Sequence, residues 1–229
     1  MVNFLEAIEY IISFDLEIYG VIALSLVVSL TATFIASIIG TPLAIFMSVT
    51  EFKLKSVIIK VIYTFMAVPP VVLGLFVVLA IANKGPFGSL NLLFTPTAMI
   101  IAQTLLVLPI IIGNIINSTE ASNKALVETC KTLGGSKKDM IKLIILETRP
   151  YILMAITLGF SKAISEVGAV MLVGGNIKGS TRVMTTYIAM SNSMGNYTKS
   201  VAMAIVLLFI AFLVNTSLLK YRGVKQWLS

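Results

Sequence analysis

The sequence predicts an all-α, polytopic membrane protein with about five transmembrane helices and a short N-terminal helix at the membrane interface. Hydrophobic residues make up 58% of the 229 residues and charged residues only 12%, about half of the roughly 25% that is usual in globular proteins. The mean hydropathy is +1.00. Five separate stretches are long and apolar enough to cross a bilayer core, which needs about 20 residues. A soluble domain of this size could not bury so much apolar surface.

The predicted spans differ in length and continuity. They cover about residues 19–49, 56–82, 97–116, 151–173 and 201–220. The first is longer than one crossing needs, and Gly40 and Pro42 mark the expected kink, while Pro69-Pro70 interrupt the second span, because proline removes a backbone donor. Such breaks persist in a bilayer only where protein or a water-filled cavity satisfies the freed carbonyls. They indicate either a transport pathway or a simple packing kink.

Residues 1–18 form a different kind of segment. Their isoleucines are interrupted by four acids, Glu6, Glu9, Asp15 and Glu17, and the segment contains no Lys or Arg. A secretory signal peptide begins with a basic region, so none is expected here. We predict an amphipathic helix that lies at the membrane interface.

The loop charges predict the orientation. With the N-terminus outside, eleven Lys and Arg residues fall in the inner segments and four in the outer ones, which is the bias typical of cytoplasmic loops. This places the loop 117–150 and the tail 221–229 in the cytoplasm, and the loop 174–200 outside. The same bias accounts for the net charge of +7 without a nucleic-acid partner.

The residue content argues against an enzyme. The chain has no His and a single Cys, Cys130, so neither a transition-metal site nor an internal disulfide is expected. No G-x-x-x-x-G-K-[ST] phosphate-binding loop occurs, and we therefore expect no ATP site and no cofactor on this chain.

The cytoplasmic loop 117–150 has its own helical pattern. Gly134-Gly135 predict the end of a first helix, and Ser136 with Asp139 forms a capping-box pattern that starts a second helix running into the fourth span. The first helix carries one face of small and apolar residues, namely Ala125, Leu126, Thr129, Cys130 and Leu133. Such an elbow could pass motion from a soluble partner to the membrane, although a basic loop that only obeys topology fits the pattern equally well.

Two pairs of charged residues are candidate functional groups. Lys162 and Glu166 lie four residues apart in the fourth span, hence on one helical face, either lining a pathway or forming a structural ion pair. Lys178 and Arg182 in the outer loop either contact acidic residues of a substrate-delivering protein or are simply solvated. Small residues of the fourth span suit a dimer interface or packing within the chain. They are Gly159, Ala163, Gly168 and Ala169.

The cytoplasmic loop also carries a family resemblance. Glu128-Thr129-Cys130, Gly134 and Ile144-x-Leu146 resemble the signature loop of permease subunits of ATP-binding-cassette importers, E-A-A-x-x-x-G, nine residues, then I-x-L-P. Thr129 and Cys130 replace the two alanines, and Glu147 replaces the proline. This last departure leaves the exit geometry of the loop open.

Three further stretches narrow the resemblance. They are "AVPPVVLGL", "FTPTAMIIAQ" and "SKAISEVGAVMLVGGNIKGSTRVMTT". All three are similar to molybdate, sulfate and tungstate permeases, and the last two look closest to the tungstate permeases. The resemblance covers about residues 20–215.

The resemblance implies a MetI-like fold in a prokaryotic inner membrane. A homodimer would sit on two ATP-binding subunits, which hold ATP and Mg, and an extracytoplasmic binding protein would deliver the oxyanion. The residues expected to couple to the ATPase are Glu128, Thr129, Cys130, Leu133, Gly134, Gly135 and Ser136. Tungstate is the expected substrate, with molybdate, sulfate or phosphate as alternatives. A stand-alone secondary transporter is a further alternative, disfavoured because we see no internal repeat.

Overall fold

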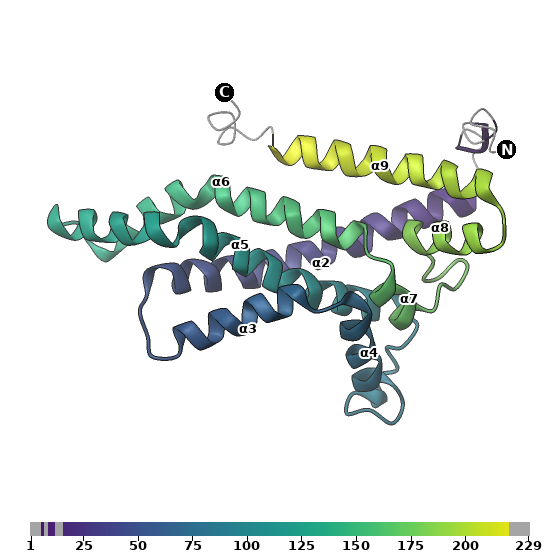
Figure 1. The fold of residues 1–229 in the computed structure, drawn as a ribbon, viewed down its shortest axis with the longest axis horizontal. Coiled ribbons are helices and arrows are strands. Elements are labelled where there is room, and N and C mark those ends of the chain that lie inside the picture. Colours follow the sequence, from purple (N-terminus) through teal and green to yellow (C-terminus); the bar gives the residue numbers. More distant parts are fainter. Residues whose placement is uncertain (1–5, 7–8, 12–15, 220–229) are drawn as a thin grey trace.

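The computed structural model describes residue 6, residues 9–11 and residues 16–219, and all its regular structure is helical. Figure 1 shows long helices lying side by side, with several of the shorter ones gathered toward one end. The helices are α2 (Leu16–Val49), α3 (Lys55–Ala67), α4 (Pro70–Ile81), α5 (Pro96–Thr132), α6 (Lys137–Ile164), α7 (Gly168–Gly174), α8 (Met184–Ser193) and α9 (Tyr197–Leu219), with a 3₁₀ turn η1 (Gly88–Leu90). The predicted all-α class is confirmed.

The number of spans also agrees with the prediction. In the described part of the chain, α2, α5, α6 and α9 are long and apolar enough to cross a membrane, and the bent pair α3–α4 makes a fifth candidate. The first turns of α6, up to Arg149, are rich in charge, so the membrane-embedded part of this helix begins near Pro150. The protein is therefore a multi-pass membrane protein.

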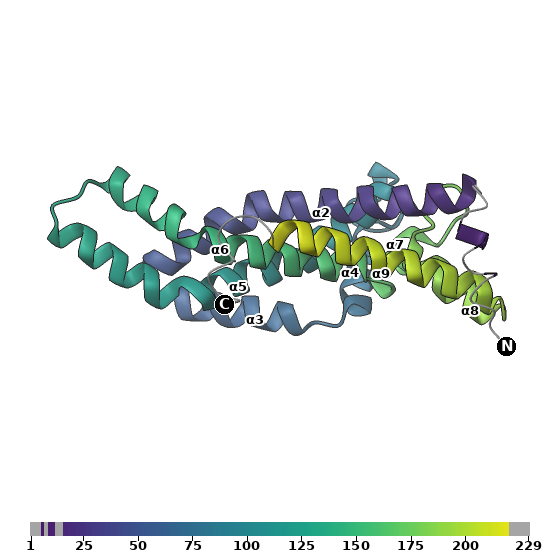
Figure 2. The same cartoon turned by 90° about the horizontal axis from the view of Figure 1, so that it is seen from above.

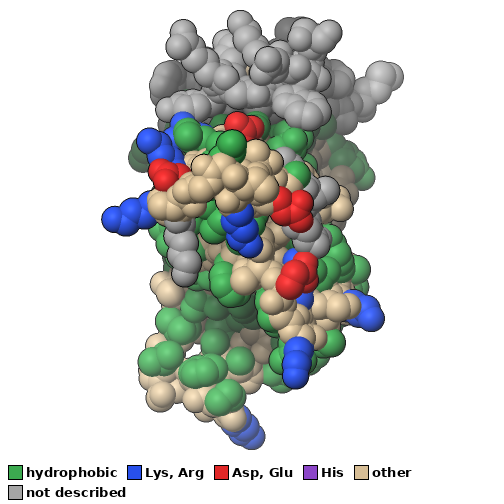
Figure 3. Space-filling model, turned by 90° about the vertical axis from the view of Figure 1, so that its left-hand side faces the viewer, with side chains coloured by type: hydrophobic (Ala, Val, Ile, Leu, Met, Phe, Trp, Pro, Cys, Tyr) green, Lys and Arg blue, Asp and Glu red, His purple; other side chains and the backbone are tan. Residues whose placement is uncertain are grey.

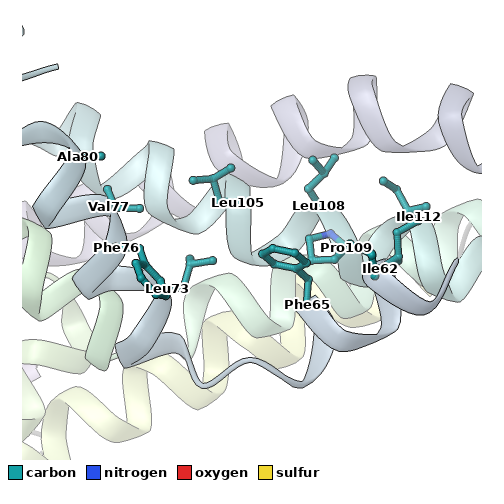
Figure 4. A pocket seen from close by; sticks show the side chains of 11 residues that line it. Ile62, Phe65, Leu73, Phe76, Val77, Ala80, Leu105, Leu108, Pro109 and Ile112 are labelled. Carbon is teal, nitrogen blue, oxygen red and sulfur yellow. The ribbon is translucent and has the colours of Figure 1, made fainter. Parts of the chain in front are cut away.

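The second span bends where the two prolines predict. The axes of α3 and α4 differ by 101°, and both Val68 (ψ 128°) and Pro69 (ψ 131°) are extended, because a proline disfavours the helical conformation of the residue before it. Apolar side chains of α3 and α4 face α5 across the bend, as Figure 4 shows, and enclose a groove of about 570 Å³.

The first span, by contrast, is not divided. Helix α2 continues through Gly40 and Pro42 for 34 residues, or about 51 Å. A Cβ on Gly40 would lie 3.3 Å from side-chain atoms of Leu108, Ile111 and Ile112 of α5. The glycine thus lets the two longest helices approach closely.

The predicted fourth span is wrong as a single helix. The stretch 151–173 is divided between α6, which ends at Ile164, and α7, which begins at Gly168. No proline marks this break. Glu166 holds it open, because its carboxylate accepts a hydrogen bond from the backbone N–H of Ala169 at 3.1 Å.

The small residues of this stretch are used inside the chain. Gly159 lies against Val107 and Ile111 of α5, and Gly168 lies against Val71 of α4. Ala163 and Ala169 are fully buried. Of the two readings of this surface, packing within the chain therefore accounts for it.

The two ends of the molecule differ in kind. Figure 2 shows the hairpin of α5 and α6 extending beyond the α2–α3 connection at one end, while the start of α2, α7 and α8 gather at the other. Most of the predicted interfacial segment 1–18 lies outside the described residues, although Leu16–Ile18 belong to α2. The predicted tail 221–229 also lies outside them.

Candidate functional site

The projecting hairpin, here called the arm (residues 117–149), closes in a tight bend. Gly134 has a φ of +73°, a conformation that glycine adopts without a steric cost. Its N–H donates to the carbonyl of Lys131 at 3.1 Å, and that of Gly135 donates to the carbonyl of Cys130 at 2.9 Å. These two bonds form a Schellman motif, so the predicted end of the first helix is confirmed.

Gly135, the next residue, lies close to the side chain of Cys130. Cys130 is 9% exposed, and a Cβ on Gly135 would lie 2.6 Å from its Sγ. The thiol therefore packs under the bend, and a larger residue at position 135 would require the Cys130 side chain to move.

The second helix of the arm begins with the predicted capping box. The Ser136 Oγ accepts a hydrogen bond from the Asp139 N–H at 3.3 Å, and the Asp139 carboxylate accepts one from the Ser136 N–H at 3.0 Å and one from its hydroxyl at 2.6 Å. The hydrogen bond from the Ser136 hydroxyl lowers the pKa of the Asp139 carboxyl most, and the bond from the Ser136 backbone N–H lowers it further. The carboxylate stays charged at the positive end of the helix dipole, which favours it.

The tip of the arm presents one large apolar side chain. Leu133 is 81% exposed, and Glu128 and Thr129 are exposed as well. The apolar face predicted for this helix is therefore covered only in part. The tip therefore presents one exposed leucine beside the polar side chains of Glu128 and Thr129.

The pair Lys162 and Glu166 lies at the break between α6 and α7. Lys162 Nζ and Glu166 Oε2 are 4.0 Å apart, with 42% of the lysine side chain and 6% of the glutamate side chain exposed. Their spacing of four residues predicts that they lie on one face of a single helix. The structure differs, because α6 ends at Ile164 and Glu166 follows it. The ion pair instead bridges the end of one helix and the linker to the next.

Glu166 has further contacts that fix its position. Besides capping α7, its backbone carbonyl accepts a hydrogen bond from Thr185 Oγ1 at 2.7 Å, which connects the linker to the start of α8. These contacts support a structural part for Glu166, whereas the half-exposed Lys162 stays accessible.

A third polar residue at this level has no counterpart among the predicted site residues. Gln103 of α5 is 3% exposed, and its Nε2 donates to the carbonyl of Ala163 at 3.0 Å. This carbonyl also accepts from the Glu166 N–H at 3.2 Å, so Gln103 braces the end of α6. Among the described side chains, Gln103 Oε1 is a buried atom without a hydrogen-bond partner. The sequence signal for Gln103 is a polar residue inside the predicted span 97–116.

Lys178 and Arg182 both form ion pairs with Glu17 of α2. Lys178 Nζ lies 2.7 Å from Glu17 Oε2, and Arg182 Nη1 lies 3.0 Å from Glu17 Oε1. The Arg182 Nε also donates to Asn176 Oδ1 at 3.3 Å, and its side chain is 13% exposed, against 68% for Lys178. Arg182 thus anchors the start of α2 to the loop between α7 and α8, while Lys178 stays largely accessible.

The described residues contain no group of three or more His, Cys, Asp or Glu side chains that could hold a metal ion. The arrangement comprises an ordered, exposed arm tip and a polar break between α6 and α7.

Comparison with known proteins identifies the family. Residues 40–219 match the family described as "Binding-protein-dependent transport system inner membrane component". The chain belongs to this family. The matched region includes the arm, the α3–α4 bend and the α6–α7 break. The MetI-like fold expected from the sequence is thereby confirmed.

Several relatives of this permease are named as tungstate or molybdenum permease proteins. It is 48% identical over 213 residues to the tungstate uptake system permease protein TupB of Peptoclostridium acidaminophilum, with 93% of each chain covered. It is 37% identical to TupB of Campylobacter jejuni, over 72% of this chain and 69% of the relative. The molybdenum transport system permease protein ModB of Azotobacter vinelandii is 28% identical, over 91% and 96%.

Proposed function

We propose that the permease is the membrane subunit of an ATP-driven importer of a tetrahedral oxyanion, and that this anion is tungstate. The observation that carries the proposal is the 48% identity, over 93% of both chains, to a protein named as a tungstate uptake permease. Molybdate is the competing substrate, because a more distant relative is named as a molybdenum permease. The chain itself would hold no ATP, and its energy would come from a separate subunit.

The arm is the proposed contact with that ATP-binding subunit. Its supports are the ordered bend at Gly134, the capping box of Ser136 and the exposed side chain of Leu133. Both helices of the arm continue without interruption into the membrane. A closure of the ATPase dimer around the tip would therefore be transmitted to the bilayer. In this proposal the arm lies in the cytoplasm and the N-terminus lies outside.

A second copy of the chain is proposed to complete the pathway. The Lys162 side chain is 42% exposed at the α6–α7 break, within the predicted fourth span. An ammonium group facing lipid at that depth costs at least about 2.5 kcal/mol. Water in a shared pathway between two copies would hydrate it, and its charge would lower the barrier for an anion.

Delivery by an external binding protein is proposed at the opposite end. The cluster of Glu17, Lys178 and Arg182 has one carboxylate and two cations, and Lys178 is its most exposed member. We propose that Lys178, more than the enclosed Arg182, meets an acidic residue of the binding protein. Lys178→Gln should then weaken that complex, whereas an unchanged affinity would contradict the contact.

The substrate is tested by uptake into proteoliposomes. The permease is reconstituted with its ATP-binding subunit and its binding protein, and the tungsten, molybdenum and sulfur taken up with ATP are measured by elemental mass spectrometry. We expect ATP-dependent uptake that selects tungstate. Uptake of molybdate or sulfate in preference to tungstate would overturn the substrate, and uptake without ATP would overturn the transporter class.

The coupling role of the arm is tested by a matched pair of glycine substitutions. Gly134 and Gly195 have φ values of +73° and +75°, and both have open space where a Cβ would lie. Gly134→Val and Gly195→Val therefore impose similar backbone strain at opposite ends of the molecule. We expect only Gly134→Val, together with Glu128→Ala, to reduce tungstate uptake relative to ATP hydrolysis or to release the ATP-binding subunit. Equal losses in both glycine variants would contradict the role of the arm.

A further inference from the structure

One exposed face of α6 combines basic and aliphatic side chains, and we call it the basic stripe. Its six residues line a groove of about 360 Å³ and are Lys138, Ile141, Lys142, Ile145, Leu146 and Arg149. At about 100° per residue they fall within roughly 140° of one side of the helix. The stripe is therefore a single continuous surface.

The described part of the chain leaves the side chains of the stripe exposed. Ile144 and Thr148, on another side of α6, are buried, whereas Ile141, Ile145 and Leu146 are 53%, 41% and 43% exposed. Three aliphatic side chains thus stand open beside the cations. Figure 3, which looks at the arm end of the molecule, shows Lys and Arg side chains distributed around it.

The charge of the stripe is uncompensated. Its three cations, at positions 138, 142 and 149, form no ion pair within the described residues. Among the nearest acids, Asp139 of the capping box borders the stripe beside Lys138, and Glu147 lies about 160° around the helix from Arg149. The stripe therefore carries a net positive charge, and an anionic partner would meet the least repulsion near Arg149.

The position of the stripe identifies its partner. Arg149 directly precedes Pro150 and Tyr151, where the apolar part of α6 begins, and tyrosine is typical of the membrane–water boundary. With the arm in the cytoplasm, the stripe rises from the surface of the inner leaflet. The basic side chains match the phosphate of a lipid headgroup, and the aliphatic ones between them match the carbons of its glycerol and acyl groups. We propose that the basic stripe binds the headgroup of an anionic phospholipid of the inner leaflet.

The geometry also predicts a gradient along the stripe. Lys138 lies eleven residues before Arg149, or about 16 Å farther from the membrane, whereas a surface potential decays over about 8 Å at physiological salt. Arg149 should therefore contribute most to lipid binding, Lys142 less, and Lys138 least. Docking of the ATP-binding subunit at the tip would give the reverse order.

Native mass spectrometry of the full chain tests this proposal. The probe is an equimolar mixture of phosphatidylglycerol and phosphatidylcholine in detergent, without any other subunit, and the measured quantity is the ratio of the two lipids retained. We expect Arg149→Gln to lower this ratio roughly fivefold, Lys142→Gln to lower it less, and the triple variant with Lys138→Gln to bring it near one. Lys131→Gln removes an exposed arm lysine outside the stripe and should leave the ratio unchanged.

Three results would overturn the proposal. The first is an unchanged lipid ratio in the triple variant. The second is a fall of the ratio in Lys131→Gln as large as that in Arg149→Gln. The third is a triple variant that no longer binds the ATP-binding subunit but keeps its lipid preference. Ile145→Ser is a second, uncharged test, because it should lower retention of both lipids. None of these measurements uses transport, so the proposed substrate and the proposed lipid site can fail independently.

Discussion

The contact between α4 and α7 can be tested by adding a single methyl group. A Cβ on Gly74 would lie 2.7 Å from the Cα of Ala169 and 3.2 Å from its Cβ. Carbon atoms in contact are normally about 3.5–4.0 Å apart, so the gap is too small by about 1 Å. Because backbone atoms stand on both sides, no side-chain rotation can relieve the overlap, and Gly74→Ala must push the two helices apart.

The expected cost follows from two opposing terms. Overpacking of this kind destabilises by about 1–3 kcal/mol, while replacing a helical glycine by alanine stabilises by about 0.5–1 kcal/mol. Gly20 of α2 provides the control, because a Cβ there meets nothing within 4 Å. Gly20→Ala carries the second term alone. The difference between the two variants therefore isolates the overpacking, at about 1–3 kcal/mol.

The assay is reversible unfolding of the full chain in mixed micelles, followed by helical circular dichroism as sodium dodecyl sulfate is titrated. We expect Gly20→Ala to unfold at the same or a higher denaturant fraction than the unmodified chain, and Gly74→Ala at a lower fraction than Gly20→Ala. If Gly74→Ala unfolds together with Gly20→Ala or later, α4 and α7 are not packed as described.

Substitutions at three further residues give graded expectations. Gln103→Leu removes a hydrogen bond and a buried unpartnered acceptor together, so the free energy of unfolding should change by less than about 1 kcal/mol. Gln103→Ala also opens a cavity and should lower it by about 2 kcal/mol. Equal losses of stability for the two variants in thermal unfolding would contradict this account. The lowered pKa of Asp139 means that its cap stabilises α6 above the ordinary aspartate pKa of about 3.9 and loses this effect as the pH falls through the lowered value. The protection of the amides in the first turn of α6, measured as the exchange rate relative to the intrinsic rate at each pH, should therefore fall at acidic pH in the unmodified chain but not in Asp139→Asn. Glu17→Gln leaves Arg182 without its carboxylate and should cost about 1 kcal/mol, and this difference should shrink as salt is added; an unchanged cost at high salt would rule out an ionic origin.

The parts of the fold that could be predicted are those fixed by neighbouring residues. Pro69-Pro70 forced the bend between α3 and α4, Gly134 ended α5, and Ser136 with Asp139 began α6, each within four residues of its cause. Backbone restriction and capping act at this range, so the sequence carries the whole signal. The arm, as an ordered elbow, follows from these signals alone.

The unpredicted features depend on residues far apart in the chain. The break after Ile164 has no proline. It is stabilised by hydrogen bonds of three side chains on different elements, Glu166 of the linker, Thr185 of α8 and Gln103 of α5. Arg182 meets Glu17 across 165 positions. A periodic apolar pattern looks the same whether a helix continues or is stopped by such distant contacts, and this explains why the stretch 151–173 was predicted to be a single span.

The length of α5 has a mechanical consequence. Its 37 residues make a rod of about 55 Å. If the rod turns about its buried middle near Val107, Thr132 at the tip lies about 38 Å from the pivot and Pro96 about 17 Å. A sideways step at the tip then becomes a step less than half as long at the far end, delivered with more than twice the force. Helix α5 thus has the proportions of a reducing lever, suited to parting tightly packed groups by a short distance.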